Sequence, residues 1–419
     1  MKKILVLNSG SSSLKYALFN VTNGVLLKNK SASGTVEKIG QNSQIVKHSY
    51  TNTHNGETEK ISETNDSLST HTHALKHVLQ LLSRSFKCSI SELNVGAVGH
   101  RVVHGGESLK STQIINPRVM ELIEEASTLA PLHNPSNMLG IKTAVEMFPS
   151  YVPHVAAFDT AFHSSVPKHA HVYGVPYHLY TDHHVRKYGF HGTSHEFVAK
   201  EAATFMQRPL DSLRLITCHL GAGASVSCIE NGKSIDHSMG MTPMSGLLMQ
   251  TRCGDLDPSV IFHLINRLKM SPDEVEYMLL KESGWFGLSG IEDARQLEDS
   301  FLDQEVISER TITAVECMVH RIRGYLGNYM WQLGGHVDAV VFTGGVGENW
   351  PSLRKLCFTG AEGFGFEVDD EVNDRTIRVG SIVDVSAVGS ERRILVIPTD
   401  EEYSIAETTW GLVNSHNQI

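Results

Sequence analysis

Long apolar runs and an excess of basic residues are both absent from this 419-residue chain. No apolar run approaches the roughly 20 residues that span a bilayer, so no membrane partner is expected. The chain holds 46 Asp and Glu against 36 Lys and Arg, a formal net charge of -10, whereas a protein that binds the nucleic-acid backbone usually has the opposite sign. We therefore expect no nucleic-acid partner, and we look for positive charge gathered locally in a few arginines and backbone N–H nests.

Cysteine is scarce as well, with six residues and no C-x-x-C pair, so reduced thiols in a reducing compartment are expected. The 23 histidines include no H-E-x-x-H or Cys/His zinc pattern, which argues against a structural zinc site. Lys2 and Lys3 precede the apolar residues 4–7, but this run is too short for a signal peptide and ends at Asn8. The sequence thus predicts a soluble, cytoplasmic protein.

The length exceeds what one hydrophobic core usually supports, which predicts two domains. One pattern occurs twice, roughly 210 residues apart: an apolar strand, a turn of small residues, a second strand and an Asn-Gly turn. The first copy comprises residues 4–7, 8–13, 14–19 and 23–24, and the second comprises 213–218, 221–223, 224–229 and 231–232. A repeat at this spacing indicates a duplicated domain rather than a solenoid, whose repeats are about 20–50 residues long.

Helices alternate with strands in the second half of the chain. Asp257-Pro258 provides an N-cap and a proline for a first helical turn, and apolar residues spaced by threes and fours predict a long helix over 312–333. A strand over 337–342 and a glycine loop over 344–347 follow it. The polar stretch 40–73 is expected to form surface hairpins or a mobile excursion. This alternation predicts an α/β fold with ligands at the strand ends.

Three turns of small residues follow predicted strands, at residues 8–13, 221–223 and 344–347. Gly and Ser let backbone N–H groups approach a phosphate closely, although a single turn of this kind is more often a tight structural turn. None matches the Walker A or G-x-G-x-x-G pattern. Because two of the three lie in the repeated unit, we expect a nucleotide clamped between two related domains. Lys15 could reach a phosphate there, and Asn8 could serve Mg²⁺.

Three charged residues outside these turns stand in contexts that suggest chemistry. Arg101 lies among glycines and histidines, and Arg252 lies shortly before Gly254, so a ligand could approach either one. A guanidinium fork matches carboxylate and phosphoryl oxygens, with a surface ion pair as the alternative role. Asp159 follows the apolar run 155–158, a typical catalytic placement at a strand end and also a common N-cap position.

His191 precedes a predicted helix. Thr193 and Glu196 have the spacing of a capping box, which would start the helix at that point. A helix N-terminus attracts anions, so His191 is a candidate to act on a phosphoryl group.

Nine segments of the chain form a larger pattern, in this order: LVLNSGSSSLKY, GHRVVHGGE, LAPLHNPSN, AFDTAFH, YGFHGTSH, CHLGAGAS, MTPMSGLLMQTRCGDLDP, FTGGVGEN and IPTDEE. Together they resemble the acetate kinase family of the acetate and sugar kinase/Hsp70/actin superfamily, nearly from end to end. The resemblance implies two related actin-like, ribonuclease H-like domains with a nucleotide cleft between them. The first would comprise residues 1–160 with 396–419, and the second residues 161–395.

The resemblance also implies the reaction. A phosphoryl group would pass reversibly from ATP to acetate, giving ADP and acetyl phosphate by direct in-line attack of the carboxylate. Mg²⁺ would be required, with Mn²⁺ as an alternative, and the protein would be a homodimer.

By the same resemblance, each candidate residue receives a role. The catalytic residues would be Asp159, His191 and Arg252, and the Mg²⁺ ligands Asn8 and Glu401. Acetate would be bound by Arg101, Val103, Leu132, Phe190 and Pro243. ATP would be bound by Lys15, His219, Leu220, Gly221, Ala222, Gly223, Asp293, Ala294, Arg295, Gly345, Val346, Gly347, Glu348 and Asn349.

Three positions depart from the family's usual residues: Ala222 replaces Asn or Asp, Ser245 replaces Glu, and Gln250 replaces Gly. Because of these departures, the sequence does not predict which nucleotide is preferred. Gln250 is close to Arg252 in the sequence and could change the position of its side chain. Val103 favours acetate, because related propionate kinases tend to carry a smaller residue there. Propionate or butyrate kinase is an alternative function. A non-catalytic actin/Hsp70-like nucleotide switch is a weaker one, because a switch needs no arginine for a carboxylate.

Overall fold

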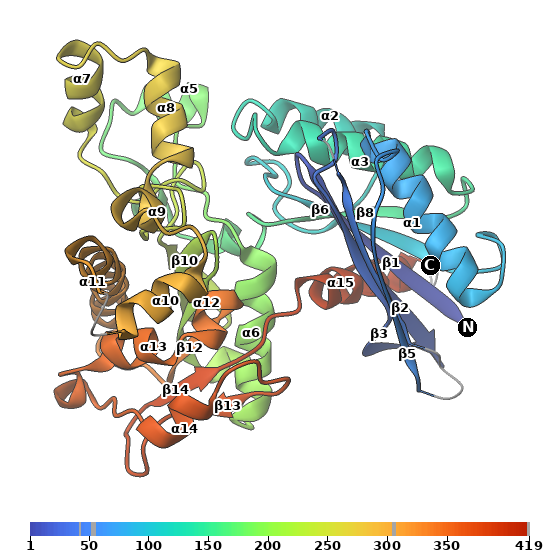
Figure 1. The fold of residues 1–419 in the computed structure, drawn as a ribbon. Coiled ribbons are helices and arrows are strands. Elements are labelled where there is room, and N and C mark those ends of the chain that lie inside the picture. Colours follow the sequence, from blue (N-terminus) through green and yellow to red (C-terminus); the bar gives the residue numbers. More distant parts are fainter. Residues whose placement is uncertain (42, 52–55, 304–306, 417–419) are drawn as a thin grey trace. The chain divides into compact units, whose positions relative to one another are not determined.

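The computed structural model describes residues 1–419 apart from 42, 52–55, 304–306 and 417–419 (Figure 1). The chain forms two compact units: unit 1 comprises residues 1–161 and 400–419, and unit 2 comprises residues 162–399. Each unit is built around one mixed β-sheet. Among the described residues, every helix falls short of the length and apolarity that a bilayer-spanning segment needs.

In the described residues, the sheet of unit 1 has eight strands in the order β5-β4-β3-β2-β1-β6-β8-β7. They are β1 (Lys2–Ser9), β2 (Ser13–Thr22), β3 (Val25–Glu37), β4 (Ile45–Thr51), β5 (Thr58–Thr64), β6 (Val95–Val102), β7 (Gln113–Ile114) and β8 (His154–Phe158). β1 pairs antiparallel with β2 and parallel with β6, and β6 pairs parallel with β8. Asn23 and Gly24 join β2 to β3 with φ angles of 53° and 79°, as a two-residue type I′ hairpin requires.

Helices cover both faces of this sheet. They are α1 (His71–Phe86), α2 (Pro117–Ala126), α3 (Asn134–Met147) and α15 (Glu401–His416). Leu5 of β1 and Leu75 of α1 share one buried core. Side chains alternate along strands, so Ile4 and its partner Phe19 face the other way. On that face Phe19 packs edge-on against Tyr403 of α15, with ring centroids 5.8 Å apart.

The sheet of unit 2 repeats the plan of unit 1. Its six described strands are ordered β11-β10-β9-β12-β14-β13. They are β9 (Arg214–Leu220), β10 (Ala224–Glu230), β11 (Lys233–His237), β12 (Ala339–Thr343), β13 (Val383–Asp384) and β14 (Arg393–Val396). β9 to β11 form antiparallel hairpins, with Asn231-Gly232 at the second turn, and β12 runs parallel to β9 and β14. The order β3-β2-β1-β6-β8-β7 in unit 1 matches all six strands of unit 2, which confirms the predicted α/β fold with a duplicated unit.

Helices of unit 2 surround this sheet. The α-helices are α4 (Lys168–His171), α5 (His178–His183), α6 (Gly192–Phe205), α7 (Pro258–Asn266), α8 (Pro272–Lys281), α9 (Gly284–Ser289), α10 (Ala294–Leu302), α11 (Glu309–Gln332), α12 (Gly344–Asn349), α13 (Pro351–Phe358) and α14 (Asp370–Arg375). Short 3-10 turns are η1 (Phe162–Ser165), η2 (Leu210–Ser212) and η3 (Glu362–Phe364). The predicted long helix is α11, and Asp257 caps α7 by accepting from the Ser259 N–H.

Two local predictions were wrong. Residues 344–347, expected as a loop, form the first turn of α12. No capping box forms at α6, because the helix begins at Gly192 and Thr193 lies inside it. Glu196 pairs with Lys200 one turn on instead. In the described part of the polar stretch 40–73, β4 pairs antiparallel with β5, which is the surface-hairpin alternative; residues 42 and 52–55 of this stretch lie outside the described residues.

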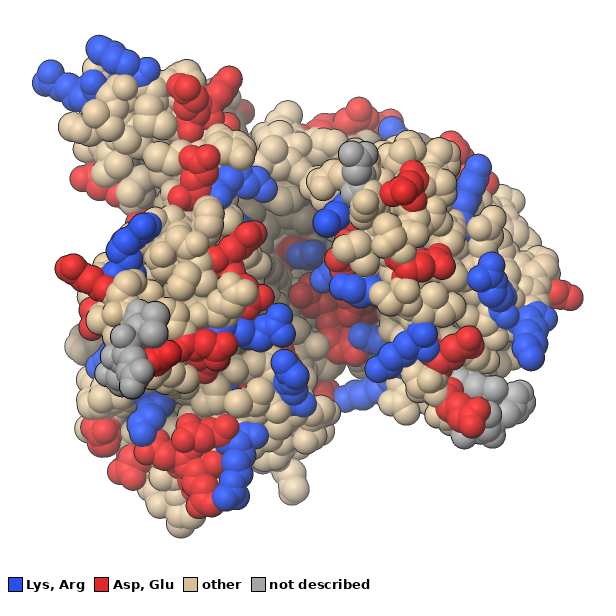
Figure 2. Space-filling model, viewed as in Figure 1, with Lys and Arg blue, Asp and Glu red and all other residues tan. Residues whose placement is uncertain are grey.

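Surface charges of both signs are mixed. On the face shown in Figure 2, Lys and Arg are interspersed with Asp and Glu. Exposed pairs include Lys355 with Asp370 at 2.6 Å and Arg393 with Asp384 at 2.7 Å. Such pairs contribute little to stability in water. The half-buried arginines described below say more about function than these surface pairs do.

Candidate active site

In unit 1, Arg101 and Asp159 stand at the ends of the neighbouring parallel strands β6 and β8. The Arg101 guanidinium donates from Nε and Nη2 to the two carboxylate oxygens of Asp159, at 2.8 and 2.6 Å. Asp159 is only 1% exposed, and this burial raises its pKa while Arg101 opposes the rise. Burial alone would lower the pKa of Arg101, but Asp159 and Glu401 outweigh it, so the pKa is raised and the guanidinium stays cationic.

Glu401 opens α15 beside this pair. Its Oε2 lies 3.7 Å from Arg101 Nε. The adjacent residues Asp400 and Glu402 both bind Lys30, at 3.0 and 3.3 Å. Asp400 and Glu402 therefore share the single positive charge of Lys30, whereas Glu401 lies beside Arg101.

The turn between β1 and β2 is held from outside by two side chains. Asn137 Nδ2 of α3 donates to a carbonyl oxygen at the end of β1, at 2.6 Å. His71 Nε2 of α1 lies 2.7 Å from the Gly10 carbonyl oxygen. The strand register pairs Asn8 with Lys15, so the predicted metal ligand and the predicted phosphate-binding lysine occupy opposite positions of one hairpin.

The four apolar residues predicted to line the acetate pocket come from both units. In unit 1, Val103 is half-buried with its N–H held by Asn137 Oδ1 at 3.1 Å, and Leu132 is 53% exposed. In unit 2, Phe190 is buried and Pro243 is half-buried. Their joint action on acetate stays a prediction.

In unit 2, His191 adopts a backbone conformation that residues other than glycine rarely take. It is the N-cap residue of α6, with φ 57° and ψ 24°, and its side chain makes no capping hydrogen bond. Left-handed conformations at non-glycine residues cost energy and gather at functional sites. The strain places this imidazole at the start of α6 while leaving it available for a role other than capping.

His191 stacks on His219, which lies near the end of β9, with ring centroids 4.3 Å apart. A serine hydroxyl binds each ring at Nδ1: Ser225 Oγ lies 2.9 Å from His191 Nδ1, and Ser194 Oγ lies 2.8 Å from His219 Nδ1. The opposite ring edges lie toward the small-residue turn. A Cβ added at Gly223 would be 3.3 Å from His191 Nε2.

Arg252 approaches the same turn. Its Nη1 donates to the Pro243 carbonyl oxygen at 2.5 Å, and a Cβ added at Gly223 would lie 2.8 Å from its Nη2. Burial lowers the pKa of Arg252, and in the described residues no carboxylate forms an ion pair with it. Glycine is therefore needed at position 223, because any side chain there would displace the guanidinium.

A cavity of about 380 Å³ in unit 2 brings together three predicted ATP-binding segments that lie far apart in the sequence. These segments are the turn at 221–222, residues 293–295 at the start of α10, and Gly345, Val346 and Asn349 of α12. The volume lies in the range of small-molecule pockets, which is about 300–1,000 Å³. Its other lining residues are Gln250, Trp285, Glu292 and Arg378.

Residues 3–407 match the model of the Acetokinase family. The chain belongs to the acetokinase family. The acetate kinase of Thermoanaerobacterium thermosaccharolyticum is 44% identical to it over 415 residues, which cover 99% of each chain. The acetate kinase of Acetivibrio thermocellus is 43% identical over 414 residues, covering 98% of this chain and 99% of the relative.

Solved acetokinase-family structures share the fold. The acetate kinase of Porphyromonas gingivalis superposes with a TM-score of 0.88 at 39% identity, covering 99% of this chain and 100% of that one. A propionate kinase from Francisella tularensis superposes with a TM-score of 0.87 at 35% identity, covering 98% and 100%. The fold is therefore the predicted α/β fold with two related domains.

Six predicted ATP-binding residues of this acetokinase-family chain do not line the cavity: Lys15, His219, Leu220, Gly223, Gly347 and Glu348. Leu220 is 2% exposed, and its backbone packs against Gly344. Glu348 Oε1 accepts the N–H groups of Gly344 at 2.9 Å and Thr399 at 3.1 Å. The carboxylate of Glu348 thus stabilises the start of α12 by hydrogen bonds to two backbone N–H groups.

Three residues of this cavity were not named in the sequence predictions: Trp285, Glu292 and Arg378. Trp285 is buried, and its indole N–H donates to the Glu292 carbonyl oxygen at 3.4 Å. One local signal precedes it: Gly284 has φ 66°, and any side chain there would collide with the Met249 carbonyl. A glycine directly before a large aromatic residue marks such a close approach. Arg378 carries no comparable signal in the sequence.

Gln250, one of the departures from the acetokinase pattern, links two walls of the cavity. Its N–H donates to the Ala222 carbonyl oxygen and its Nε2 to the Glu292 carbonyl oxygen, both at 3.1 Å. The amide is thereby turned toward Glu292, and Arg252 keeps its hydrogen bond to Pro243.

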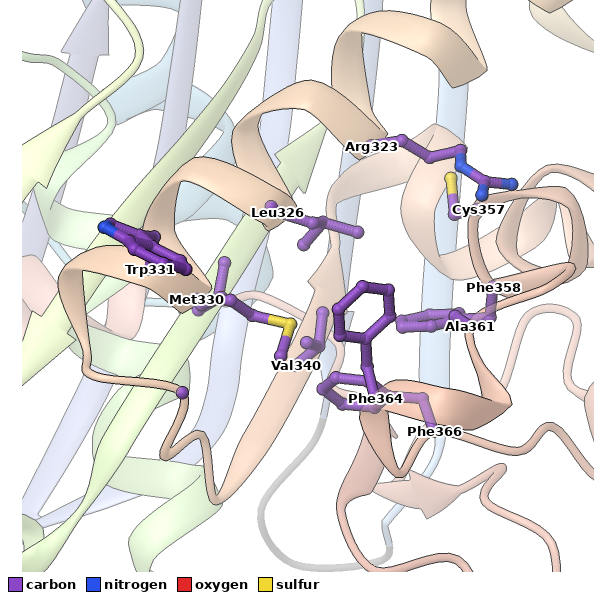
Figure 3. A pocket seen from close by; sticks show the side chains of 13 residues that line it. Arg323, Leu326, Met330, Trp331, Val340, Cys357, Phe358, Ala361, Phe364 and Phe366 are labelled. Carbon is purple, nitrogen blue, oxygen red and sulfur yellow. The ribbon is translucent and has the colours of Figure 1, made fainter.

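A second cavity of unit 2, of about 530 Å³, differs in character (Figure 3). It lies between α11 and the segment from α13 to η3, and its walls include Leu326, Met330, Phe358, Phe364 and Phe366. Arg323 at its edge donates from Nη1 to the carbonyl oxygens of Leu356 and Thr359. This largely apolar lining does not suit phosphates, so the smaller cavity is the nucleotide candidate.

Proposed function

We propose that this chain transfers the γ-phosphoryl group of ATP reversibly to acetate, giving ADP and acetyl phosphate. The proposal rests chiefly on the approach of Arg252 Nη2 and His191 Nε2 to the backbone at Gly223, next to the cavity of the other ATP-binding segments. Donors gathered at a small-residue turn suit a transferring phosphoryl group, whose negative charge is spread over its equatorial oxygens. We take acetate as the acceptor because the relatives named above are acetate kinases.

Unit 2 would bind ATP and stabilise the transferring group. The cavity would take the nucleoside end, and the N–H groups of residues 221–223 would meet the phosphates. Arg252 is held by the Pro243 carbonyl and His191 by the Ser225 hydroxyl. Because both donors are positioned in advance, little reorganisation would be needed during transfer.

Unit 1 would bind acetate through Arg101. A carboxylic acid with a pKa near ~4 is already ionised at neutral pH, so attack on phosphorus requires no strong general base. Asp159 accepts two hydrogen bonds from Arg101 and is shielded from solvent. We therefore assign Asp159 to orienting the acetate-binding guanidinium rather than to removing a proton.

The residues of unit 1 also fit Mg²⁺. Asn8 and Glu401 offer amide and carboxylate oxygens, the ligand type that this ion takes, and it usually keeps several waters. Among the described residues, no group of three His, Cys, Asp or Glu could hold a metal together, so waters would complete the shell. When bound, the ion would neutralise charge on the β- and γ-phosphates, and Mn²⁺ would suit the same ligands.

An assay of acyl phosphate formation as hydroxamate, with ATP, Mg²⁺ and acetate, propionate or butyrate, tests this function. We expect the highest kcat/KM for acetate, with propionate lower by about 10- to 200-fold because the pocket must hold one more methylene. Equal values for acetate and propionate would reassign the chain to the propionate kinases. ATP binding without transfer to any of the three acids would favour the nucleotide switch.

We propose in addition that the protein is a cytoplasmic homodimer. Large apolar side chains on and beside α7 and α8 are exposed, with Phe262 at 63%, Leu268 at 61% and Tyr277 at 59%. Such groups mark interaction surfaces, and all six cysteines are free thiols, as suits a reducing compartment. Light scattering should give twice the chain mass of 46.2 kDa, and Phe262→Glu with Leu268→Glu should give a monomer. A monomeric parent protein would contradict the proposal.

A further inference from the structure

A chain of hydroxyl and imidazole groups leads from His191 into the interior of unit 2. Ser225 Oγ lies 2.9 Å from His191 Nδ1 and 2.8 Å from His195 Nε2. At the opposite edge of its ring, His195 Nδ1 lies 2.7 Å from Thr217 Oγ1. Ser225, His195 and Thr217 have no solvent exposure. Three elements contribute, α6, β9 and β10, and the chain ends in the core rather than at the surface.

The serine hydroxyl holds one proton and faces two ring nitrogens. Within the described residues Ser225 Oγ has no third hydrogen-bond partner, so it makes both bonds by donating to one ring and accepting from the other. His195 is neutral, because burial, followed by the nearby His163 and His219, lowers its pKa well below the ordinary value. It therefore carries one ring proton, and the direction of the Ser225 hydroxyl decides which nitrogen holds that proton.

We propose that these groups form a two-state relay that keeps His191 fully hydrogen-bonded at Nδ1 whether it is neutral or cationic. In the neutral state, Ser225 donates to His191 Nδ1 and accepts from His195 Nε2–H. The Thr217 hydroxyl then donates to His195 Nδ1. In the cationic state, His191 Nδ1–H donates to Ser225, which donates to His195 Nε2. The ring proton of His195 is then on Nδ1 and is donated to Thr217.

The two states differ by one proton taken up from water, and the ring proton of His195 sits on a different nitrogen in each. His191 keeps an N–H at Nε2 in both, on the edge that approaches Gly223. This inference rests on the proposed function, in which that edge meets the transferring phosphoryl group. Ser225 and His195 touch no reactant in this scheme; they are positioning residues that act through His191.

Other titratable and charged groups surround the relay on every side. His219 stacks on His191 from β9, and Arg252 shares the approach to Gly223. From η1 and β11, the rings of His163 and His237 lie 5.7 and 5.4 Å from that of His195. Burial lowers the pKa of both of these histidines, and Lys187 lowers it further. Charged side chains near the relay include Arg252, Lys187 and Asp236, which pairs with Lys187 and accepts from the His237 N–H at 2.7 Å.

Histidine ¹⁵N spectroscopy of the full-length protein tests the relay directly. Two-bond ¹H–¹⁵N spectra would be followed between about pH 5 and 9, with signals assigned from His191→Gln and His195→Gln. We expect the His195 pattern to change from Nε2–H to Nδ1–H with the same midpoint as the protonation of His191. A His195 pattern that stays constant through that transition would overturn the proposal. So would a His191 that does not change its protonation in this range.

A matched pair of variants separates the relay from simple loss of a buried hydroxyl. Ser227 lies two residues along β10 from Ser225, is equally buried, and bonds Ser234 Oγ at 3.2 Å outside the relay. Ser225→Ala should lower kcat by at least about 10-fold, shift the acid limb of its pH profile, and leave KM for ATP and acetate within about threefold. Ser227→Ala should leave all three near the parent values.

The outcomes distinguish failure of the relay from failure of the proposed function. An active enzyme in which Ser225→Ala and Ser227→Ala behave alike would overturn the relay and leave acetate phosphorylation intact. A protein without transfer activity would end the proposed function, yet the coupled change of the His195 and His191 signals would still show the relay.

Discussion

The two units carry different side chains on the same arrangement of six strands. In unit 1 the first turn is rich in serine and is braced by Asn137 and His71. In unit 2 the equivalent turn is Gly-Ala-Gly, and Arg252 and His191 approach it. The shared strand order brings side chains to the same edge of each sheet, whereas the segments between the strands decide which side chains arrive.

The two candidate arginines show what this difference does to charge. Arg101 donates to the carboxylate of Asp159, and its pKa is raised. Arg252 donates to the neutral carbonyl of Pro243, and burial lowers its pKa. The positive charge in unit 1 is therefore largely balanced by a neighbour, whereas that in unit 2 is left for a ligand. A guanidinium without a neighbouring carboxylate attracts a multiply charged phosphoryl group strongly. A guanidinium paired with a carboxylate attracts a singly charged acid more weakly, which favours reversible binding.

Loss of the uncompensated cation should have the largest effect. We expect Arg252→Ala to lower kcat by about 10³- to 10⁵-fold, the range for an arginine that stabilises transferring phosphoryl charge, with a smaller change in the KM for acetate. Arg252→Lys serves as the matched control, because it keeps the charge but not the fork and should recover part of the loss. A coupled assay measures both. Near-normal turnover of the alanine variant would remove Arg252 from the mechanism.

Loss of the balanced cation should act on stability as well as on binding. Arg101→Ala leaves the buried Asp159 carboxylate without its partner, so the free energy of unfolding should fall by about 3–5 kcal/mol. The KM for acetate should rise at the same time. Urea unfolding and steady-state kinetics measure the two effects.

The double variant Arg101→Ala/Asp159→Asn separates these effects. It removes the unpaired charge, so it should regain most of the stability while its KM for acetate stays high. A single Arg101→Ala variant as stable as the parent would mean that the pair is no stronger than a surface contact.

The two turns can be compared by adding one methyl group to each. A Cβ at Gly223 would lie 2.8 Å from Arg252 Nη2, and one at Gly10 would lie 2.8 Å from Ser13 Oγ. The serine hydroxyl can rotate away, whereas Arg252 is anchored by a hydrogen bond. Gly223→Ala should therefore lower kcat by about 10²- to 10³-fold, as for loss of one preorganised donor, and Gly10→Ala by much less. Equal losses would show that the two turns perform the same task.

The repeated unit could be predicted because its signals are local. Apolar strands and Asn-Gly turns specify hairpins within a few residues, and both hairpins occur in the structure. Residues 293–295 and 345–349 were proposed from family motifs, and the fold brings 293–295 together with Gly345, Val346 and Asn349 at one cavity. Arg378 and the Ser225–His195 contact could not be predicted, because their partners come from distant elements. The α6 capping box failed because the left-handed backbone of His191 starts the helix earlier.

The smallest effect concerns which acid unit 1 accepts. Val103 is half-buried and comes directly after β6, which carries Arg101, the guanidinium proposed to bind acetate, and the Val103 N–H is fixed by Asn137. Val103→Ala should raise the kcat/KM of propionate relative to acetate, by no more than the about 1–3 kcal/mol that one methylene provides. Leu132→Ala is the control at an exposed position predicted for the same pocket. If the leucine variant shifts the ratio and the valine variant does not, Leu132 rather than Val103 limits the size of the acid that binds.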